Sequence, residues 1–146
     1  MKKIDDFYIK AKQFCYLLEK MQVFELHQCK SLIAELMDIY KMALTLPDVE
    51  PETSDMPEVK VDRLGISFGE YDAYWEIYNS YECDSAVCGS LSDDFADIYN
   101  DLKIGILLYE YENMNDAVWQ WKWSFDNHWC YHAADALGVL NQVAFD

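Results

Sequence analysis

The sequence has few residues that interrupt a helix and few that carry positive charge. Its 146 residues include five Gly, three Pro and 11 Lys or Arg, against 27 Asp or Glu. Scarce Gly and Pro leave long segments free to form helices, and a hydrophobic content of 52% excludes a disordered chain. The net charge of −16 repels nucleic acid and anionic membranes. We therefore expect the partner to be neither a nucleic acid nor a membrane.

Long apolar runs and a secretion signal are also missing. Charged residues such as Asp5 and Lys10 interrupt the first segment, so it has no apolar signal core. No uncharged run of eighteen or more apolar residues occurs, so no segment is expected to span a bilayer. The five Cys are odd in number and scattered, which is typical of reduced thiols. We therefore expect a cytoplasmic protein.

The negative charge is concentrated beyond the first third of the chain. Residues 1–47 hold seven Lys and six Asp or Glu, whereas residues 48–146 hold four Lys or Arg and 21 Asp or Glu. Self-repulsion within such a segment costs folded stability. We therefore expect the acidic part to serve solubility or the binding of a cationic surface.

Apolar residues recur at helical spacing along most of the chain. The length fits one domain, and the pattern predicts a single all-α bundle of about five helices over 1–146. The predicted helices are 4–21, 29–44, 71–81, 90–109 and 113–143, and a long acidic loop with all three prolines occupies 47–69. The last two helices are expected to pack as an antiparallel hairpin. Ser90 or Ser92 is expected to cap the fourth helix, and the fifth is expected to kink near residues 124–127.

Four of the five Trp lie in the last predicted helix. Trp121 and Trp129 fall on its apolar stripe, so we expect them in the core. Trp119 and Trp123 lie off the stripe and are expected to cover the fourth helix or another subunit.

Histidines and aspartates form the sharpest chemical pattern. Those of the last helix are spaced i, i+4 and i+7, and those of the fourth helix also share one face, so the two sets would meet in a packed hairpin. The residues are His128, His132 and Asp135, and Asp94, Asp97 and Asp101. A structural network of buried hydrogen bonds is favoured, because the histidines lie on an apolar stripe. The alternative is a divalent metal site, which would allow a metal-dependent hydrolase.

No catalytic motif is complete. The chain lacks a Gly-rich phosphate loop, a nucleophile elbow and a Cys-x-x-Cys pair. We therefore predict no catalytic residues and no cofactor.

Aromatic residues alternate with acids between residues 70 and 82. Tyr and Trp are the residue types that anchor interfaces, and neighbouring acids steer a basic partner towards them. The candidate partner-binding residues are Glu70, Tyr71, Asp72, Tyr74, Trp75, Glu76, Tyr78, Tyr81 and Glu82. An equally open interpretation places one side of this aromatic stripe in the core.

The segment from Ser90 to Leu140 resembles a known family. It contains Asp-Asp-x-x-Asp at residues 93–97 and His-Trp-x-x-His at residues 128–132. These elements are similar to those of an uncharacterised bacterial family of small all-helical domains, known only as a domain of unknown function. The resemblance implies a helical fold and no settled reaction.

The sequence as a whole predicts a non-enzymatic binding protein. Its size, acidity and lack of catalytic motifs are typical of an immunity or antitoxin protein that neutralises a basic toxin, and we expect a monomer or weak homodimer. The alternatives are the metal-dependent hydrolase, an adaptor protein, and a DNA mimic whose carboxylates would take phosphate-like spacing.

Overall fold

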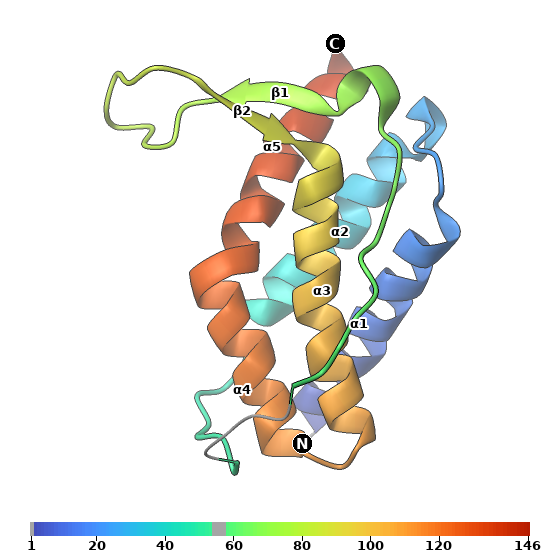
Figure 1. Ribbon diagram of the computed structural model, residues 1–146, viewed down its shortest axis with the longest axis vertical. Coiled ribbons are helices and arrows are strands. Elements are labelled where there is room, and N and C mark those ends of the chain that lie inside the picture. Colours follow the sequence, from blue (N-terminus) through green and yellow to red (C-terminus); the bar gives the residue numbers. More distant parts are fainter. Residues whose placement is uncertain (1, 54–57) are drawn as a thin grey trace.

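Helices dominate the chain in this computed structural model, which describes residues 2–53 and 58–146. The described residues form a bundle of four helical rods (Figure 1). The first three rods are α1 (Lys2–Lys20), α2 (Cys29–Ala43) and α3 (Leu91–Glu110). The fourth consists of α4 (Met114–Ser124), a π-helical turn (Phe125–Trp129) and α5 (Cys130–Phe145) in direct succession. Single 3₁₀ turns occur at Leu26–Gln28 and Gly69–Tyr71.

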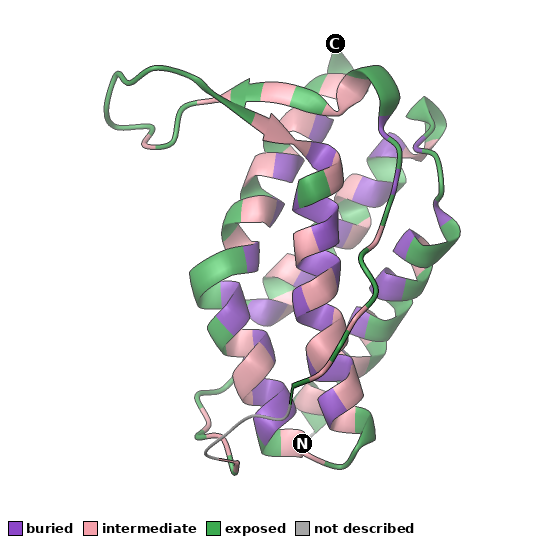
Figure 2. Ribbon diagram, viewed as in Figure 1, coloured by how far each residue is buried: buried purple, intermediate pink, exposed green. Residues whose placement is uncertain are grey.

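The rods enclose one apolar core. Helix α1 packs on α2 and α3, α2 packs on α5, and α3 packs on both α4 and α5. Buried residues line the inner faces of the rods (Figure 2). The prediction for Trp121 and Trp129 is confirmed, because both are fully buried, whereas Trp123 is 51% exposed and stacks on Trp119. No helix of the described residues is both long and apolar enough to cross a membrane.

The predicted pairing of the last two helices is also present. Helix α3 begins after Ser90, whose hydroxyl accepts a hydrogen bond from the Asp93 N–H, as expected of an N-cap. Residues 111–113 then turn the chain, and α4 and α5 pack back along α3. The π-helical turn lies where a kink was expected, and a wider turn of this kind changes the direction of the side chains around it.

The helix predicted at 71–81 is wrong, and the described residues form four helical rods instead of the expected five or so. This segment instead forms β1 (Ala73–Glu76), which pairs antiparallel with β2 (Val87–Ser90), so the fold is mostly helical with a small two-stranded sheet. Tyr74 lies opposite Gly89 in the register, and a Cβ on Gly89 would lie within 2.5 Å of the Tyr74 ring. The missing side chain therefore lets the tyrosine ring cross the strand pair.

The long connection between α2 and β1 contains the segment 47–69 that was predicted as a loop. It crosses the bundle from the end of α2 to the end where the hairpin lies (Figure 1). Its described part has no helix or paired strand before a bridge between Ser67 and Val23, and buried Ile66 and Phe68 fasten it to the core. The predicted loop contains all three prolines of the chain, and one of them, Pro57, lies outside the described residues.

A buried carboxylate fastens the start of the same connection. Asp116, in the first turn of α4, is 1% exposed. Its carboxylate accepts hydrogen bonds from the Glu52 N–H at 2.7 Å, the Thr53 N–H at 3.3 Å and the Thr53 hydroxyl at 2.7 Å. Burial opposes ionisation of this carboxyl, but the Thr53 and Glu52 donors outweigh it and lower the pKa of Asp116.

We expect Asp116→Ala to lower the free energy of unfolding by about 2 kcal/mol at pH 7, because it leaves several donors unpaired. A carboxyl whose pKa is lower in the folded state stabilises the fold above its unfolded pKa, and this contribution is lost as the pH falls through the folded pKa. The difference between variant and wild type should therefore shrink below about pH 4 in urea titrations. Asp126→Ala, at an exposed carboxylate of the same rod, is the control and should cost under about 0.5 kcal/mol. Equal losses in the two variants would contradict the role of Asp116.

Candidate functional site

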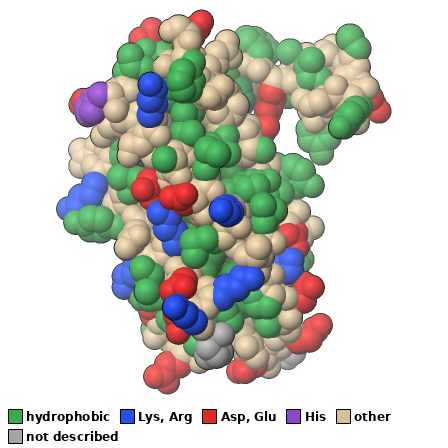
Figure 3. All heavy atoms as spheres, turned by 180° about the vertical axis from the view of Figure 1, so that it is seen from behind, with side chains coloured by type: hydrophobic (Ala, Val, Ile, Leu, Met, Phe, Trp, Pro, Cys, Tyr) green, Lys and Arg blue, Asp and Glu red, His purple; other side chains and the backbone are tan. Residues whose placement is uncertain are grey.

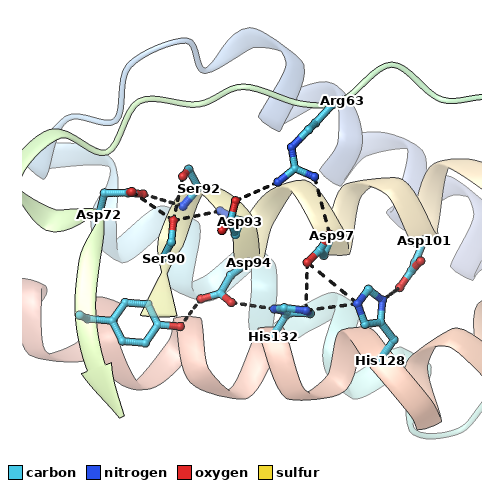
Figure 4. A network of polar contacts seen from close by, with 11 residues as sticks. Arg63, Asp72, Ser90, Ser92, Asp93, Asp94, Asp97, Asp101, His128 and His132 are labelled. Carbon is cyan, nitrogen blue, oxygen red and sulfur yellow. Dashed lines mark hydrogen bonds and ion pairs between the residues drawn. The ribbon is translucent and has the colours of Figure 1, made fainter. Parts of the chain in front are cut away.

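Two histidines and three aspartates meet where α3 packs on the last rod (Figure 4). His128 lies in the π-helical turn, and its Nδ1 is 2.6 Å from Asp101 Oδ2. His132 lies one turn later in α5, and its Nδ1 is 2.7 Å from Asp94 Oδ1. The two carboxylates are buried, at 7% and 4% exposure, so each fixes the orientation of one imidazole.

The other ring nitrogens of the two histidines point towards each other. His128 Nε2 and His132 Nε2 are 3.3 Å apart, and the rings are nearly perpendicular. Asp97 Oδ2 lies 3.1 Å from His132 Nε2 and 4.0 Å from His128 Nε2. These three atoms therefore form one cluster, and the three residues could hold a metal ion.

The electrostatics of the cluster follow from its burial. Burial raises the pKa of both Asp94 and Asp101, and hydrogen bonds with the histidines oppose this rise. The hydrogen bond with Asp94 raises the pKa of His132, against the effect of burial. The Tyr74 hydroxyl also donates to Asp94, which ties strand β1 to the cluster.

A cation from the long connection lies beside the cluster. Arg63 Nη2 is 2.8 Å from Asp93 Oδ1, and Arg63 Nη1 is 3.9 Å from Asp97 Oδ1 (Figure 4). Sequence periodicity could not indicate Arg63, because it lies in an irregular segment. The only available signal is that it is the single Arg of the chain.

Asp135 occupies a different position from the one expected. It does not join the atoms shared by Asp97, His128 and His132 but pairs with Glu76 of β1. Burial and the hydrogen bond with Asp135 raise the pKa of Glu76 to about 7. The aspartates of α3 meet the histidines as the spacing predicted, and the third carboxylate of the cluster is Asp97.

Two hollows border the cluster. One, of about 630 Å³, is lined by Arg63, Tyr74, Asp97, His132 and Asp135, among others. The other, of about 660 Å³, is lined by both histidines, Asp135 and residues of the loop after β1. Solutes can therefore approach the cluster from the surface.

The other predicted partner-binding residues separate into two groups. Tyr71, Asp72 and Tyr74 are half-buried, and Asp72 accepts hydrogen bonds from the Ser90 hydroxyl and the Ser92 N–H. The rest of the segment projects from the bundle as the tip of the β1–β2 hairpin, residues 75–87, which we call the hairpin tip (Figure 1). Its exposed large apolar side chains are Trp75, Ile77, Tyr78, Tyr81 and Val87. Glu82 of the predicted set is exposed there, Glu76 is half-buried, and Glu70 is exposed outside the tip.

Fold and cluster together define a small four-helix bundle with histidines and aspartates between its last two rods. The chain belongs to the family described as a domain of unknown function, DUF5063, whose model matches residues 1–146. This confirms the resemblance to an uncharacterised family. Among solved structures, it is similar to the crystal structure of protein BF1032 from Bacteroides fragilis. The two chains are 23% identical, the match covers 100% of this chain and 97% of the other, and the TM-score is 0.81, which supports the fold alone. A search of the curated proteins found no match.

Proposed function

We propose that this chain is a binding protein that holds a basic protein partner through the hairpin tip, as an immunity or antitoxin protein holds a cationic toxin. The observation that carries the proposal is the exposure of aromatic side chains at the tip. Trp75 is 74% exposed, Tyr78 is 93% exposed and Tyr81 is 100% exposed. Such a group costs solubility in a free monomer, and it is the type of surface that anchors protein interfaces.

The charge around the tip supports a cationic partner. No Lys, Arg or His occurs between Arg63 and Lys103, and the exposed acids Glu82 and Asp84 lie in the tip itself. Figure 3 shows hydrophobic and acidic side chains on the protruding hairpin, whereas the Lys and Arg side chains visible from this side lie on the body of the molecule. Long-range attraction would raise the association rate of a basic protein, and the aromatic rings would supply the contact area.

The shape of the tip fits this use. A two-stranded hairpin that projects from a bundle can enter a groove of another protein. The base of this hairpin is fastened to α3 by the hydrogen bond that the Tyr74 hydroxyl donates to the Asp94 carboxylate. Side chains of the hairpin tip can therefore be replaced without disturbing the packing of the core. This separation allows binding and stability to be tested independently.

We expect the double variant Tyr78→Ala and Tyr81→Ala to weaken binding by about 2 kcal/mol or more, which is about a 30-fold rise in Kd. Its melting temperature should stay within about 1 °C of wild type, because both side chains are almost fully exposed. The first candidate partner is the product of the gene adjacent to the one for this chain, since an immunity protein is normally encoded beside its toxin. Surface plasmon resonance gives Kd and the association rate constant.

Tyr111→Ala is the matched control. Tyr111 is 71% exposed but lies at the turn between α3 and α4, at the other end of α3 from the hairpin. Its replacement should leave Kd unchanged. The association rate constant of wild type should fall steeply between about 0.01 M and 0.15 M salt, where the screening length drops from about 30 Å to about 8 Å. A partner that binds the double variant as tightly as wild type, or associates at a salt-independent rate, contradicts the proposal.

A further inference from the structure

The histidine–aspartate cluster has the organisation of a metal centre. In metal sites, a histidine that binds the ion through one ring nitrogen usually donates its other N–H to a carboxylate. Here both Nδ1 atoms have a buried carboxylate partner, Asp101 for His128 and Asp94 for His132. When these Nδ1 atoms carry the protons, the neutral imidazoles have their lone pairs on Nε2. Both lone pairs then face the Asp97 carboxylate.

Three electron-pair donors at such short range favour a cation, either a proton or a metal ion, between them. Two Nε2 lone pairs 3.3 Å apart repel each other, and the Asp97 carboxylate 3.1 Å from one of them adds a negative charge. A proton on His132 Nε2 could bridge to Asp97 or to His128, but a hydrogen bond is directional and weakens steeply off its axis. A metal ion has no such limit and would contact all three donors.

The spacing of the donors fits a small divalent ion. A tetrahedral zinc ion with bonds of about 2.0–2.1 Å separates its ligand atoms by about 3.3 Å. The observed separations are 3.3 Å between the two Nε2 atoms and 3.1 Å from His132 Nε2 to Asp97 Oδ2. The third separation, 4.0 Å between His128 Nε2 and Asp97 Oδ2, is longer, so binding would require the Asp97 side chain, which is 31% exposed, to move towards His128.

The chemistry of the donors selects the class of metal. Two imidazole nitrogens and one carboxylate oxygen suit transition-metal ions, whereas Ca²⁺ and Mg²⁺ prefer oxygen ligands only. The surroundings attract a cation, because Asp94, Asp101 and the Asp135–Glu76 pair lie nearby. Among the described residues, Arg63 is the single Lys or Arg whose side chain lies near the Asp97 carboxylate.

A purely structural network explains the geometry less well. His128 has 45% of its side chain exposed and His132 has 26%, so neither imidazole is needed to fill the core. The buried groups are instead Asp94 and Asp101, and burying two carboxylates costs stability. An arrangement that buries two acids in order to orient one exposed and one half-buried imidazole is explained by a ligand bound at the imidazoles.

We propose that Asp97, His128 and His132 bind one divalent transition-metal ion, with zinc as the reference ion. Asp94 and Asp101 are positioning residues that orient the two imidazoles through Nδ1. Three protein ligands leave at least one coordination position for water or an exchangeable ligand, which the hollows beside His132 can deliver. This proposal is independent of the partner-binding function.

The test is calorimetric titration of Zn²⁺ into the full chain purified without a histidine tag, after treatment with chelator. Wild type should bind one ion per chain and should melt at a higher temperature with Zn²⁺ than without. Asp97→Ala should weaken binding at least 100-fold, and Asp101→Asn about 10- to 100-fold, because the amide keeps the hydrogen bond but not the charge. Co²⁺ should give the visible absorption bands of a tetrahedral site in wild type and lose them in Asp97→Ala.

The chain offers matched controls for both ligand types. His27→Ala removes the third histidine, which is remote and paired with Glu25, and Asp93→Ala removes the carboxylate paired with Arg63. Both should bind Zn²⁺ within about 3-fold of wild type, since neither supplies a ligand. Asp97 is partly exposed, so its replacement should leave the circular dichroism melt of the metal-free protein nearly unchanged. Absence of stoichiometric binding to wild type, or equal affinity in Asp97→Ala and wild type, overturns the proposal, and neither result bears on the hairpin tip.

Discussion

Trp121→Ala should lower the free energy of unfolding by about 3–5 kcal/mol, because it removes the largest side chain at the contact of α3 and α4. The indole is fully buried, packs 4.9 Å from the Phe7 ring, and donates its N–H to the Leu102 carbonyl at 3.0 Å. Its loss leaves a cavity and removes this hydrogen bond, while the Leu102 carbonyl keeps its bond within α3. A small domain is stable by only about 5–15 kcal/mol, so urea titration at pH 7 should show a large shift in midpoint.

The neighbouring tryptophan is a control of the same size. Trp123 lies two residues later on α4 but is 51% exposed, and it stacks on Trp119 at the surface. Trp123→Ala should cost about 1 kcal/mol, which is the scale of an exposed aromatic pair. Similar losses in the two variants would mean that the indole of Trp121 contributes no more than surface stacking.

The four helical rods could be predicted from the sequence because each carries its signal locally. An apolar stripe at spacings of three and four marks α1, α2, α3 and the last rod, and Ser90 marks the start of α3 by its cap. Two neighbouring stripes joined by a short turn must pack, so the pairing of the last two rods also followed. Each of these inferences used residues within one helix or its immediate neighbour.

The hairpin could not be predicted because its determinants are distant in sequence. Tyr71, Tyr74, Trp75 and Tyr78 recur at spacings of three and four, which favours a helix, but the same residue types favour strands. Pairing depends on Gly89, which makes room for the Tyr74 ring from fifteen residues away. Periodicity within 71–81 contains no information about that partner.

The membership of the cluster was predictable, and its connectivity was not. Helical spacing placed Asp94, Asp97 and Asp101 on a face that meets the two histidines. Which carboxylate meets which ring nitrogen depends on the crossing of the rods and on the π-helical turn that carries His128. Helical spacing therefore predicted Asp135 in one cluster with the histidines, whereas in the structure it pairs with Glu76.

The two proposals divide the acidic surface between different uses. The cluster draws its negative charge from buried and half-buried aspartates that are already paired with histidine, whereas the hairpin tip has exposed acids without such partners. Strand β1 joins the two regions, because Tyr74 contacts Asp94 while Trp75, the next residue, points to solvent. Alternation along this short strand thus separates the cluster side from the partner side.

Gly105→Ala is expected to be the most destabilising of the small substitutions in this chain. A Cβ at Gly105 would lie 2.1 Å from Trp121 Nε1 and 2.3 Å from Trp121 Cδ1. The indole is fully buried and cannot withdraw, so α3 and α4 must move apart. Overpacking of this kind costs about 1–3 kcal/mol, and the clash here should place the loss at the upper end despite the higher helix propensity of alanine.

A double-mutant cycle separates this clash from a general effect of replacing glycine. In the Trp121→Ala background the space beside Gly105 is vacated, so Gly105→Ala should instead stabilise the protein by up to about 1 kcal/mol, because alanine restricts the unfolded chain and favours the helix. The sign of the effect should therefore reverse, with a coupling of about 3–4 kcal/mol between the two sites by urea titration. The contact also sets how closely α3 approaches the last rod, where Asp101 of α3 meets His128. Gly105→Ala alone should consequently weaken Zn²⁺ binding as well, and an equal stability loss in both backgrounds would show that the close approach of Gly105 and Trp121 does not hold the two rods together.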